Sequence, residues 1–146
     1  MCRFPTRPLP HPAGGGEDRE KQLTNMKTDN QVLTDSKAFA LRIIRLYDYL
    51  NEKKQLKALA QQLLRSGTSI GANIRESVNA QSRLDFINKL NIALKEANET
   101  EYWLELLHES NILEENLYDS LYEDNYEIIS LLTSITKTLR KESKSN

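Results

Sequence analysis

The absence of proline after residue 12 is the feature that most constrains this chain. From Thr34 to the C-terminus there is no proline, and glycine occurs only at positions 67 and 71. Proline removes a helical hydrogen bond, and glycine in a helix interior costs about 1 kcal/mol relative to alanine. Because these breakers are nearly absent and no strand-like alternation competes, the stretch is expected to form long helices.

Within this stretch, apolar residues recur at alternating steps of three and four, which is the period of an amphipathic helix. The segments are residues 35–53, 56–79, 82–110 and 114–141. Thr34 or Asp35 is expected to cap the first helix, and Ser82, three residues before Asp85, the third. Long helices joined by short loops must run antiparallel, so the sequence predicts an all-α, antiparallel up-down-up-down four-helix bundle. A solenoid of helical hairpins is the alternative.

The N-terminal region differs in composition. Residues 1–33 hold all four prolines and the run Gly14-Gly15-Gly16, with too little apolar surface to offset the entropy of ordering. We expect a disordered N-terminal tail at 1–33, with an ordered partner-binding arm as the alternative. The bundle is expected to occupy residues 34–141, followed by a short C-terminal tail at 142–146.

The number of cysteines and the hydropathy pattern indicate the cellular compartment of the protein. Cys2 is the only cysteine among 146 residues, so neither an internal disulfide nor a cysteine-based zinc site can form. No run approaches the roughly 20 apolar residues of a membrane span, and the start lacks a secretory apolar segment. These features favour a one-domain cytoplasmic protein without membrane attachment.

Candidate catalytic and metal-binding residues are scarce. Glu105-x-x-His108 matches one half of a di-iron site, but the only other histidine is His11 in the tail. Cys2 lies in the tail, and the serines and threonines around Ser69 have no histidine nearby in the sequence to activate them. We therefore expect no catalytic residues, no metal and no cofactor.

Small residues are concentrated between Ser66 and Ile74, where Gly67 and Gly71 lie inside a predicted helix. Something must offset the helical cost of these glycines. The favoured interpretation is close approach of a neighbouring helix, helped by Ala93 and Ala97 on the third helix. The alternative is a hollow for a ligand.

Polar residues next to the predicted core form another group. Asn73 and Arg75 lie on the second helix, and Glu96 and Glu99 share a flank of the third. Polar groups near a core need partners, so we expect a structural network linking these helices, in which Arg65 and Arg75 pair with Glu96 or Glu99. A catalytic carboxylate pair is the alternative.

Charge is unevenly distributed although the net charge is only −1. Residues 35–83 carry nine basic and four acidic side chains, a net of +5, and residues 84–146 carry six and thirteen, a net of −7. Opposite halves suit a head-to-tail assembly, and a solvated surface without a partner is the alternative. Any nucleic-acid contact must use the basic half, because the acidic half repels phosphates. The candidate residues on the first two helices are Arg42, Arg45, Lys53, Lys54 and Lys57.

The stretch TSIGANIRESVNAQSRLDFINKLNIALKEANETEYWLELL, residues 68–107, resembles the signature of bacterial four-helix-bundle proteins known as ribosomal-like or 23S-rRNA-intervening-sequence-encoded proteins. The resemblance extends over about residues 34–141. It implies a small antiparallel bundle that assembles as a pentameric ring and has no enzymatic activity. Relatives of this family include the accessory proteins of diversity-generating retroelements, which present a basic surface to nucleic acid and to a reverse transcriptase.

These observations lead to two principal hypotheses. The first is a non-catalytic scaffold, a homo-oligomer and most simply a pentamer, that binds nucleic acid, RNA in particular, through the basic patch. The second is a protein-protein interaction scaffold without a nucleic-acid role. An enzyme is the third and least favoured.

Overall fold

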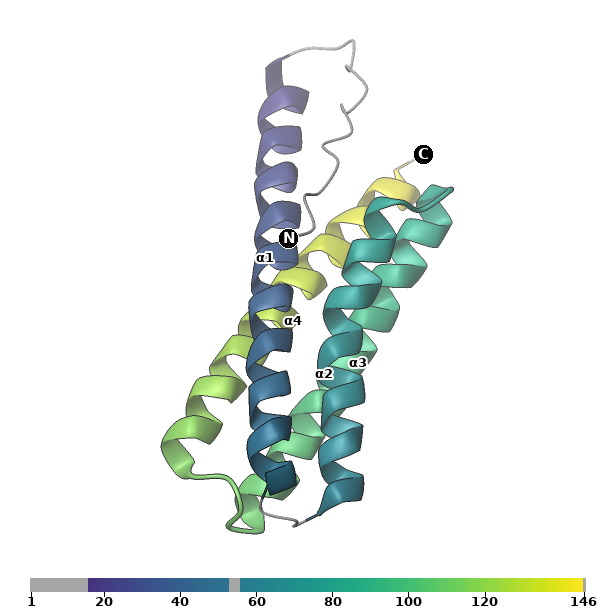
Figure 1. Ribbon diagram of the computed structural model, residues 1–146. Helices are drawn as coiled ribbons and strands as arrows, with labels where there is room; N and C mark the ends of the chain where they lie inside the picture. Colours follow the sequence, from purple (N-terminus) through teal and green to yellow (C-terminus); the bar gives the residue numbers. More distant parts are fainter. Residues whose placement is uncertain (1–15, 53–55, 146) are drawn as a thin grey trace.

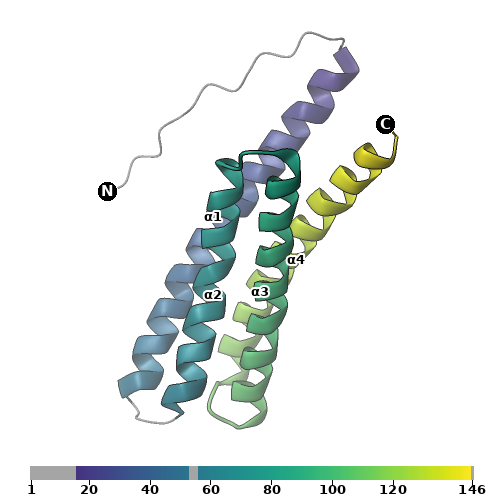
Figure 2. The ribbon, with the colours of Figure 1, turned by 90° about the vertical axis from the view of Figure 1, so that its right-hand side faces the viewer.

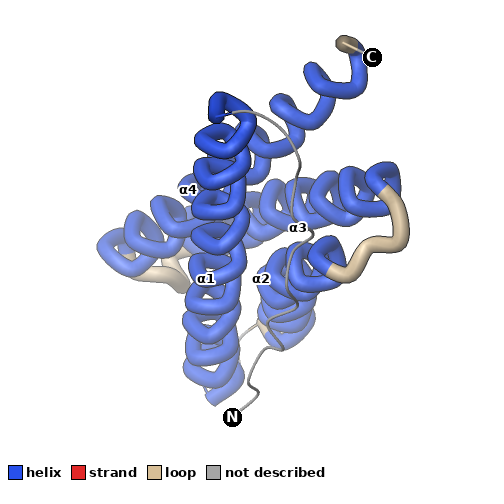
Figure 3. Tube along the Cα trace, turned by 90° about the horizontal axis from the view of Figure 1, so that it is seen from above, coloured by secondary structure: helices blue, strands red, loops and turns tan. Residues whose placement is uncertain are grey.

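The structure, a computed structural model, describes residues 16–52 and 56–145 and contains the helices α1 (Gly16–Glu52), α2 (Lys57–Val78), α3 (Arg83–Glu109) and α4 (Glu115–Lys144). Each helix contacts the next along the chain, and α1 also contacts α4. Successive helices run in opposite directions (Figures 1 and 2), and the view from above shows α4 crossing behind α1 at an angle (Figure 3). The predicted all-α, antiparallel four-helix bundle is therefore confirmed.

The core is built from one or two apolar residues per turn of each helix. The largest fully buried side chains are Phe39, Ile43, Leu50, Leu63, Ile70, Ile74, Leu90, Leu104, Leu107, Leu121, Ile128 and Leu132. These positions follow the predicted stripes, because one face of a 3.6-residue helix must be removed from water. Three apolar residues that the three-and-four spacing assigned to these stripes are exposed instead: Leu56 at 45%, Val78 at 61% and Leu117 at 37%.

Local hydrogen bonds determine where α3 begins and ends. Ser82 is the N-cap of α3, and its hydroxyl accepts a hydrogen bond from the Asp85 amide at 3.0 Å, as the sequence predicted. At the other end, Asn111 adopts a left-handed backbone conformation (φ 60°), which asparagine tolerates better than most residues. The amides of Ile112 and Leu113 then donate to the Leu107 carbonyl, so the chain turns back into α4.

The expected tail at 1–33 is wrong for its second half, because α1 already begins at Gly16. Residues 17–33 contain neither proline nor glycine, so nothing interrupts the helix. Val32 is 1% exposed and extends the core face by one turn, and Thr34 donates its hydroxyl to the Asn30 carbonyl in mid-helix instead of capping. Residues 1–15 lie outside the described residues. The expected C-terminal tail is shorter than predicted, since α4 continues to Lys144.

The small residues of α2 pack against α1. Gly67 is buried, and a Cβ atom added there would lie 2.9 Å from both Cγ1 and Cγ2 of Ile43. A Cβ on Gly71 would lie 3.4 Å from the Ser36 carbonyl oxygen. The glycines thus permit a close helix approach, and the approaching helix is α1. Ala93 and Ala97 are fully buried on α3.

Candidate functional site

Arg65 forms the main polar connection between α2 and α3. Its Nη1 lies 3.2 Å from Oε2 of Glu96, and its Nη2 donates to Oε1 of Glu99. The indole Nε1 of Trp103 donates to the same Glu99 oxygen at 3.2 Å. The hydrogen bond from Arg65 lowers the pKa of Glu99 below its ordinary value, because it stabilises the charged carboxylate.

The expected network is only partly as predicted. Arg65 does pair with Glu96 and Glu99, but Asn73 donates to the Ser69 carbonyl of its own helix at 2.8 Å, and Arg75 is exposed and has a contact of its own. The reason is register: Asn73 lies eight residues beyond Arg65, which is about 12 Å along a helix. The carboxylate pair is neutralised by a guanidinium, which fits a structural role better than acid-base catalysis.

Two buried hydrogen bonds between helices were not anticipated from the sequence. Thr100 on α3 donates to the Ser66 hydroxyl at 2.9 Å, and Asn125 on α4 donates to the Ala97 carbonyl at 2.9 Å. Asn125 is 1% exposed, and its Oδ1 has no hydrogen-bond partner among the residues that the structure describes. The sequence does contain a signal for such bonds, namely a polar residue at a position of the apolar stripe. Asn125, between Leu121 and Ile128, is an example.

The predicted nucleic-acid-binding residues do not form one open patch. Arg42 is half-buried and forms an ion pair with Asp124 at 2.5 Å and a hydrogen bond to the Ser120 hydroxyl at 3.0 Å. It therefore ties α1 to α4, and this pairing engages the guanidinium that was expected to contact nucleic acid.

The other predicted cations lie near the α1–α2 connection. Arg45 and Lys57 are exposed, and neither has an ion-pair partner within the described part of the chain. Lys53 and Lys54 lie outside the described residues. Among the described members of the predicted set, Arg45 and Lys57 are thus the exposed ones.

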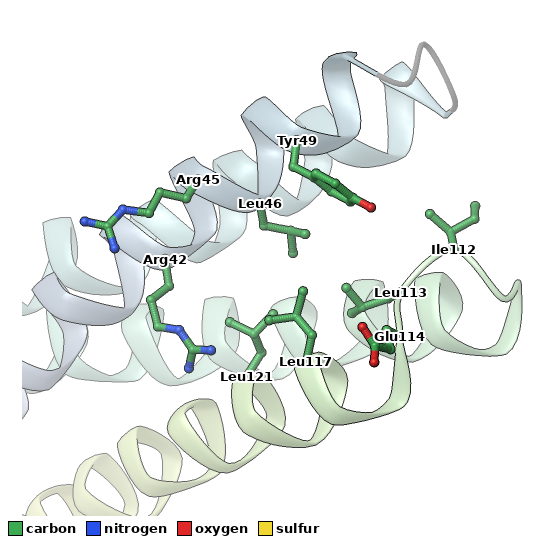
Figure 4. Close-up of a pocket in the computed structure, with 9 residues that line it drawn as sticks. All are labelled: Arg42, Arg45, Leu46, Tyr49, Ile112, Leu113, Glu114, Leu117 and Leu121. Carbon is green, nitrogen blue, oxygen red and sulfur yellow. The ribbon is translucent and has the colours of Figure 1, made fainter.

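Next to these cations is a hollow of about 420 Å³ between the end of α1 and the start of α4. Leu46, Leu113 and Leu121 face it from buried positions, and Leu117 is half-exposed at its edge. Figure 4 shows Arg42 reaching toward α4 and Arg45 extending outward, with Glu114 beside Leu113. An apolar hollow with charged residues at its edge is suited to an apolar group of a partner molecule.

Metal chemistry finds no support in the described residues, where no group of three or more His, Cys, Asp or Glu side chains could hold an ion. His108, one residue of the Glu-x-x-His match, instead stacks on Tyr118, with ring centroids 4.1 Å apart. None of the described helices has the length and hydropathy needed to cross a membrane.

Four antiparallel helices held together by cross-helix ion pairs and buried hydrogen bonds define a small all-α bundle protein. Within that class, the chain belongs to the 23S rRNA-intervening sequence protein family, whose sequence model matches residues 28–134. The resemblance noted in the sequence is thereby confirmed as far as this family.

A solved structure supports the same assignment. A protein of unknown function from the S23 ribosomal protein family of Bacteroides thetaiotaomicron VPI-5482 is 58% identical, with a TM-score of 0.73. The similarity covers 75% of this chain and 98% of the other. No curated protein matches the chain significantly.

Proposed function

We propose that this protein is a non-catalytic cytoplasmic scaffold that forms a ring-shaped homo-oligomer, most simply a pentamer, and binds RNA at the end where α1 meets α2. The observation that carries the proposal is the pair Arg45 and Lys57, which are exposed and without ion-pair partners within the described residues. In the sequence they flank Lys53 and Lys54. Four cations within thirteen residues give a local positive potential on a chain that is nearly neutral as a whole.

The choice of RNA is supported by the family. Its description refers to 23S rRNA, and the similar solved protein is assigned to a ribosomal protein family. The resemblance to retroelement accessory proteins also favours a nucleic-acid partner. A ring would present several copies of a modest basic patch, so weak contacts could add along one strand.

Fluorescence anisotropy with single-stranded RNA, duplex RNA and duplex DNA at low salt tests the proposal. Reversing two charges in R45E/K57E is expected to abolish most RNA binding, because it converts attraction to phosphate into repulsion. The matched control is K137E/R140E, which reverses the same two residue types near the far end of α4 (Figure 1) and should bind nearly as the unmodified protein does.

Salt dependence is the second readout. The logarithm of affinity should fall by about 0.7 to 0.9 per phosphate contact for each tenfold rise in salt. If no nucleic acid binds more tightly than about 100 μM, or if both double variants weaken binding equally, the RNA proposal is wrong.

The hollow between α1 and α4 favours a second candidate, a scaffold for another protein without nucleic acid. Half-exposed Leu117 and Tyr49 at its rim resemble the apolar centre of a protein interface. In that case L117E should abolish co-purification of a protein partner, whereas R45E/K57E should leave that partner bound.

A further inference from the structure

The outer surface between α3 and α4 carries a ladder of tyrosines. Tyr118, Tyr122 and Tyr126 follow one another at successive turns of α4, with ring centroids 5.8 Å and 6.3 Å apart. His108 of α3 closes the ladder by stacking on Tyr118 with the two rings nearly parallel. The three tyrosines extend over about 12 Å of α4. Tyr126, at one end of this ladder, is 58% exposed.

This ladder lies in a long segment without positive charge. Residues 96–136 contain no lysine or arginine and eleven acidic residues. Within the described residues, ion pairs involve only three of these acids, Glu96 and Glu99 with Arg65 and Asp124 with Arg42. The remaining acids, in helices α3 and α4 and in the loop between them, are in none of the ion pairs seen among the described residues.

Glu101 and Glu105 lie seven and three residues before His108 and so share its face of α3, and Asp119 follows Tyr118 on α4. Glu101 and Glu105 of α3 and Asp119 of α4 act on Tyr118: burial raises the pKa of its hydroxyl, and the negative charges of these carboxylates raise it further. We call the surface formed by Tyr118, Tyr122, Tyr126, Glu101, Glu105 and Asp119 the tyrosine face.

We propose that the tyrosine face binds an arginine-bearing or lysine-bearing segment of a partner protein. The face of a tyrosine ring attracts a cation, and arginine can stack on it while donating to a neighbouring carboxylate. Rings at successive turns, flanked by carboxylates from two helices, offer several such positions in a row. A basic segment with cations one helical turn apart matches this spacing.

Two other occupants fit the face less well. The carboxylates do not form a group that could hold a metal ion within the described part of the chain, and a negatively charged surface repels RNA. A second copy of this chain is the competing occupant, because α4 carries exposed cations at one-turn spacing that have no ion-pair partner within the described residues: Lys137, Arg140, Lys141 and Lys144. The oligomeric mass of the carboxylate variant distinguishes this occupant from a separate partner protein.

Fluorescence anisotropy of labelled peptides against the full chain tests this proposal. The probe is an alanine-based helical peptide with arginine at every fourth position, and matched peptides carry lysine or glutamate at the same positions. We expect the arginine peptide to bind best, the lysine peptide more weakly because it stacks less well, and the glutamate peptide not at all. The variant E101Q/E105Q/D119N should weaken arginine-peptide binding about tenfold or more.

The matched control removes the same charges elsewhere. The variant D48N/E52Q/E127Q changes three exposed carboxylates, two on α1 and one on the side of α4 that faces Asp35 of α1, and should keep affinity within about twofold. Circular dichroism melts show whether both variants are folded. A second readout is Y122L, which should reduce the advantage of arginine over lysine while leaving net charge unchanged.

Three results would overturn the proposal. The first is absence of arginine-peptide binding at about 100 μM and low salt. The second is an equal loss of affinity for the arginine peptide in both triple variants, which would show that binding depends only on the net charge of the protein. The third is a drop in the oligomeric mass of E101Q/E105Q/D119N alone, which would make the tyrosine face a contact between copies of the chain.

Discussion

At the scale of single residues, Gly67 shows how closely α1 and α2 approach. A Cβ at this position would lie 2.9 Å from two carbons of Ile43, closer than packed carbon atoms normally lie. We therefore expect G67A to destabilise the bundle by about 1 to 3 kcal/mol, as overpacked cores do, although alanine is the better helix former. Urea unfolding followed by circular dichroism measures the difference.

Gly71 supplies the matched comparison. A Cβ there would contact Ser36 at an ordinary distance of 3.4 Å, so G71A should be neutral or stabilising by up to about 1 kcal/mol. The double variant G67A/I43A removes both Cγ atoms that the added Cβ would meet, so G67A should cost less stability in the I43A background than in the unmodified protein. Equal stability of G67A and the unmodified protein would show that α1 can shift at no cost.

The ion pairs of Arg65 predict an acid dependence of stability. Arg65 holds the pKa of Glu99 below its ordinary value, so the folded state binds this proton less readily than the unfolded state. The resulting stabilisation is present above the unfolded pKa of about 4.3 and is lost as the pH falls through the lower folded pKa.

The variant R65M should therefore be less stable at neutral pH and should lose less further stability between about pH 5 and pH 3 than the unmodified protein. Urea midpoints at a series of pH values measure this. R83M is the control, because its ion pair with Glu142 is half-exposed on both sides and contributes little. Parallel pH profiles for R65M and the unmodified protein would contradict the assignment.

The pairing of Arg65 with Glu96 or Glu99 could be predicted from the sequence, but not that Asn73 instead donates to its own helix. The expected set of Asn73, Arg75, Glu96 and Glu99 includes both acids of the observed cluster. Which of the expected polar contacts form depends on how far α2 is displaced along α3, and helical periodicity carries no information on that displacement. The buried bond between Thr100 and Ser66 marks the register, and it places Arg65 beside the acids.

At the scale of helices, the start of α3 depends on one side chain. The Ser82 hydroxyl accepts from the Asp85 amide at 3.0 Å, which satisfies one of the amides left without a partner at a helix start. We expect S82A to destabilise the protein by about 1 kcal/mol and S82D to retain most of the stability, because aspartate is also a good cap. S145A, at the exposed C-terminal end of α4, is the control and should have no effect. Thermal melts compare the variants.

The helices themselves were largely predictable, and their outer ends were not. α2 and α3 begin and end within one or two residues of the expected positions, because Asn79 to Ser82 interrupt the apolar stripe and Ser82 caps the next helix. α1 begins 19 residues before Asp35. Its first turns project beyond the connection between α2 and α3 (Figures 1 and 2). Leu23 and Met26 are the only large apolar residues in the sequence from 16 to 31, so apolar periodicity could not reveal this part of the helix.

At the scale of the whole molecule, the opposite charges of the two halves already meet within one chain. Arg42, Arg65 and Arg83 come from the basic half, and they pair with Asp124, Glu96, Glu99 and Glu142 of the acidic half. The opposite net charges of the two halves, +5 and −7, therefore first stabilise contacts between the helices of one chain. Fewer of these charges are left to attract a second copy of the chain. Exposed apolar side chains must then contribute to any ring, because apolar groups form the centre of stable interfaces.

The last prediction concerns the proposed ring. Val78 at the end of α2 and Leu84 at the start of α3 are 61% and 69% exposed. They flank the α2–α3 connection, at the opposite end of α2 from Lys57 (Figure 1), so contacts there would leave the proposed RNA-binding end open.

We expect light scattering at micromolar concentration and moderate salt to give the mass of a multimer, five chains in the simplest case. V78D/L84D should reduce it to that of one chain, because buried charges oppose association. I44D, a comparable change on the exposed face of α1, should leave the mass unchanged. A single-chain mass for the unmodified protein would eliminate the ring, and an unchanged mass for V78D/L84D would place the contact elsewhere.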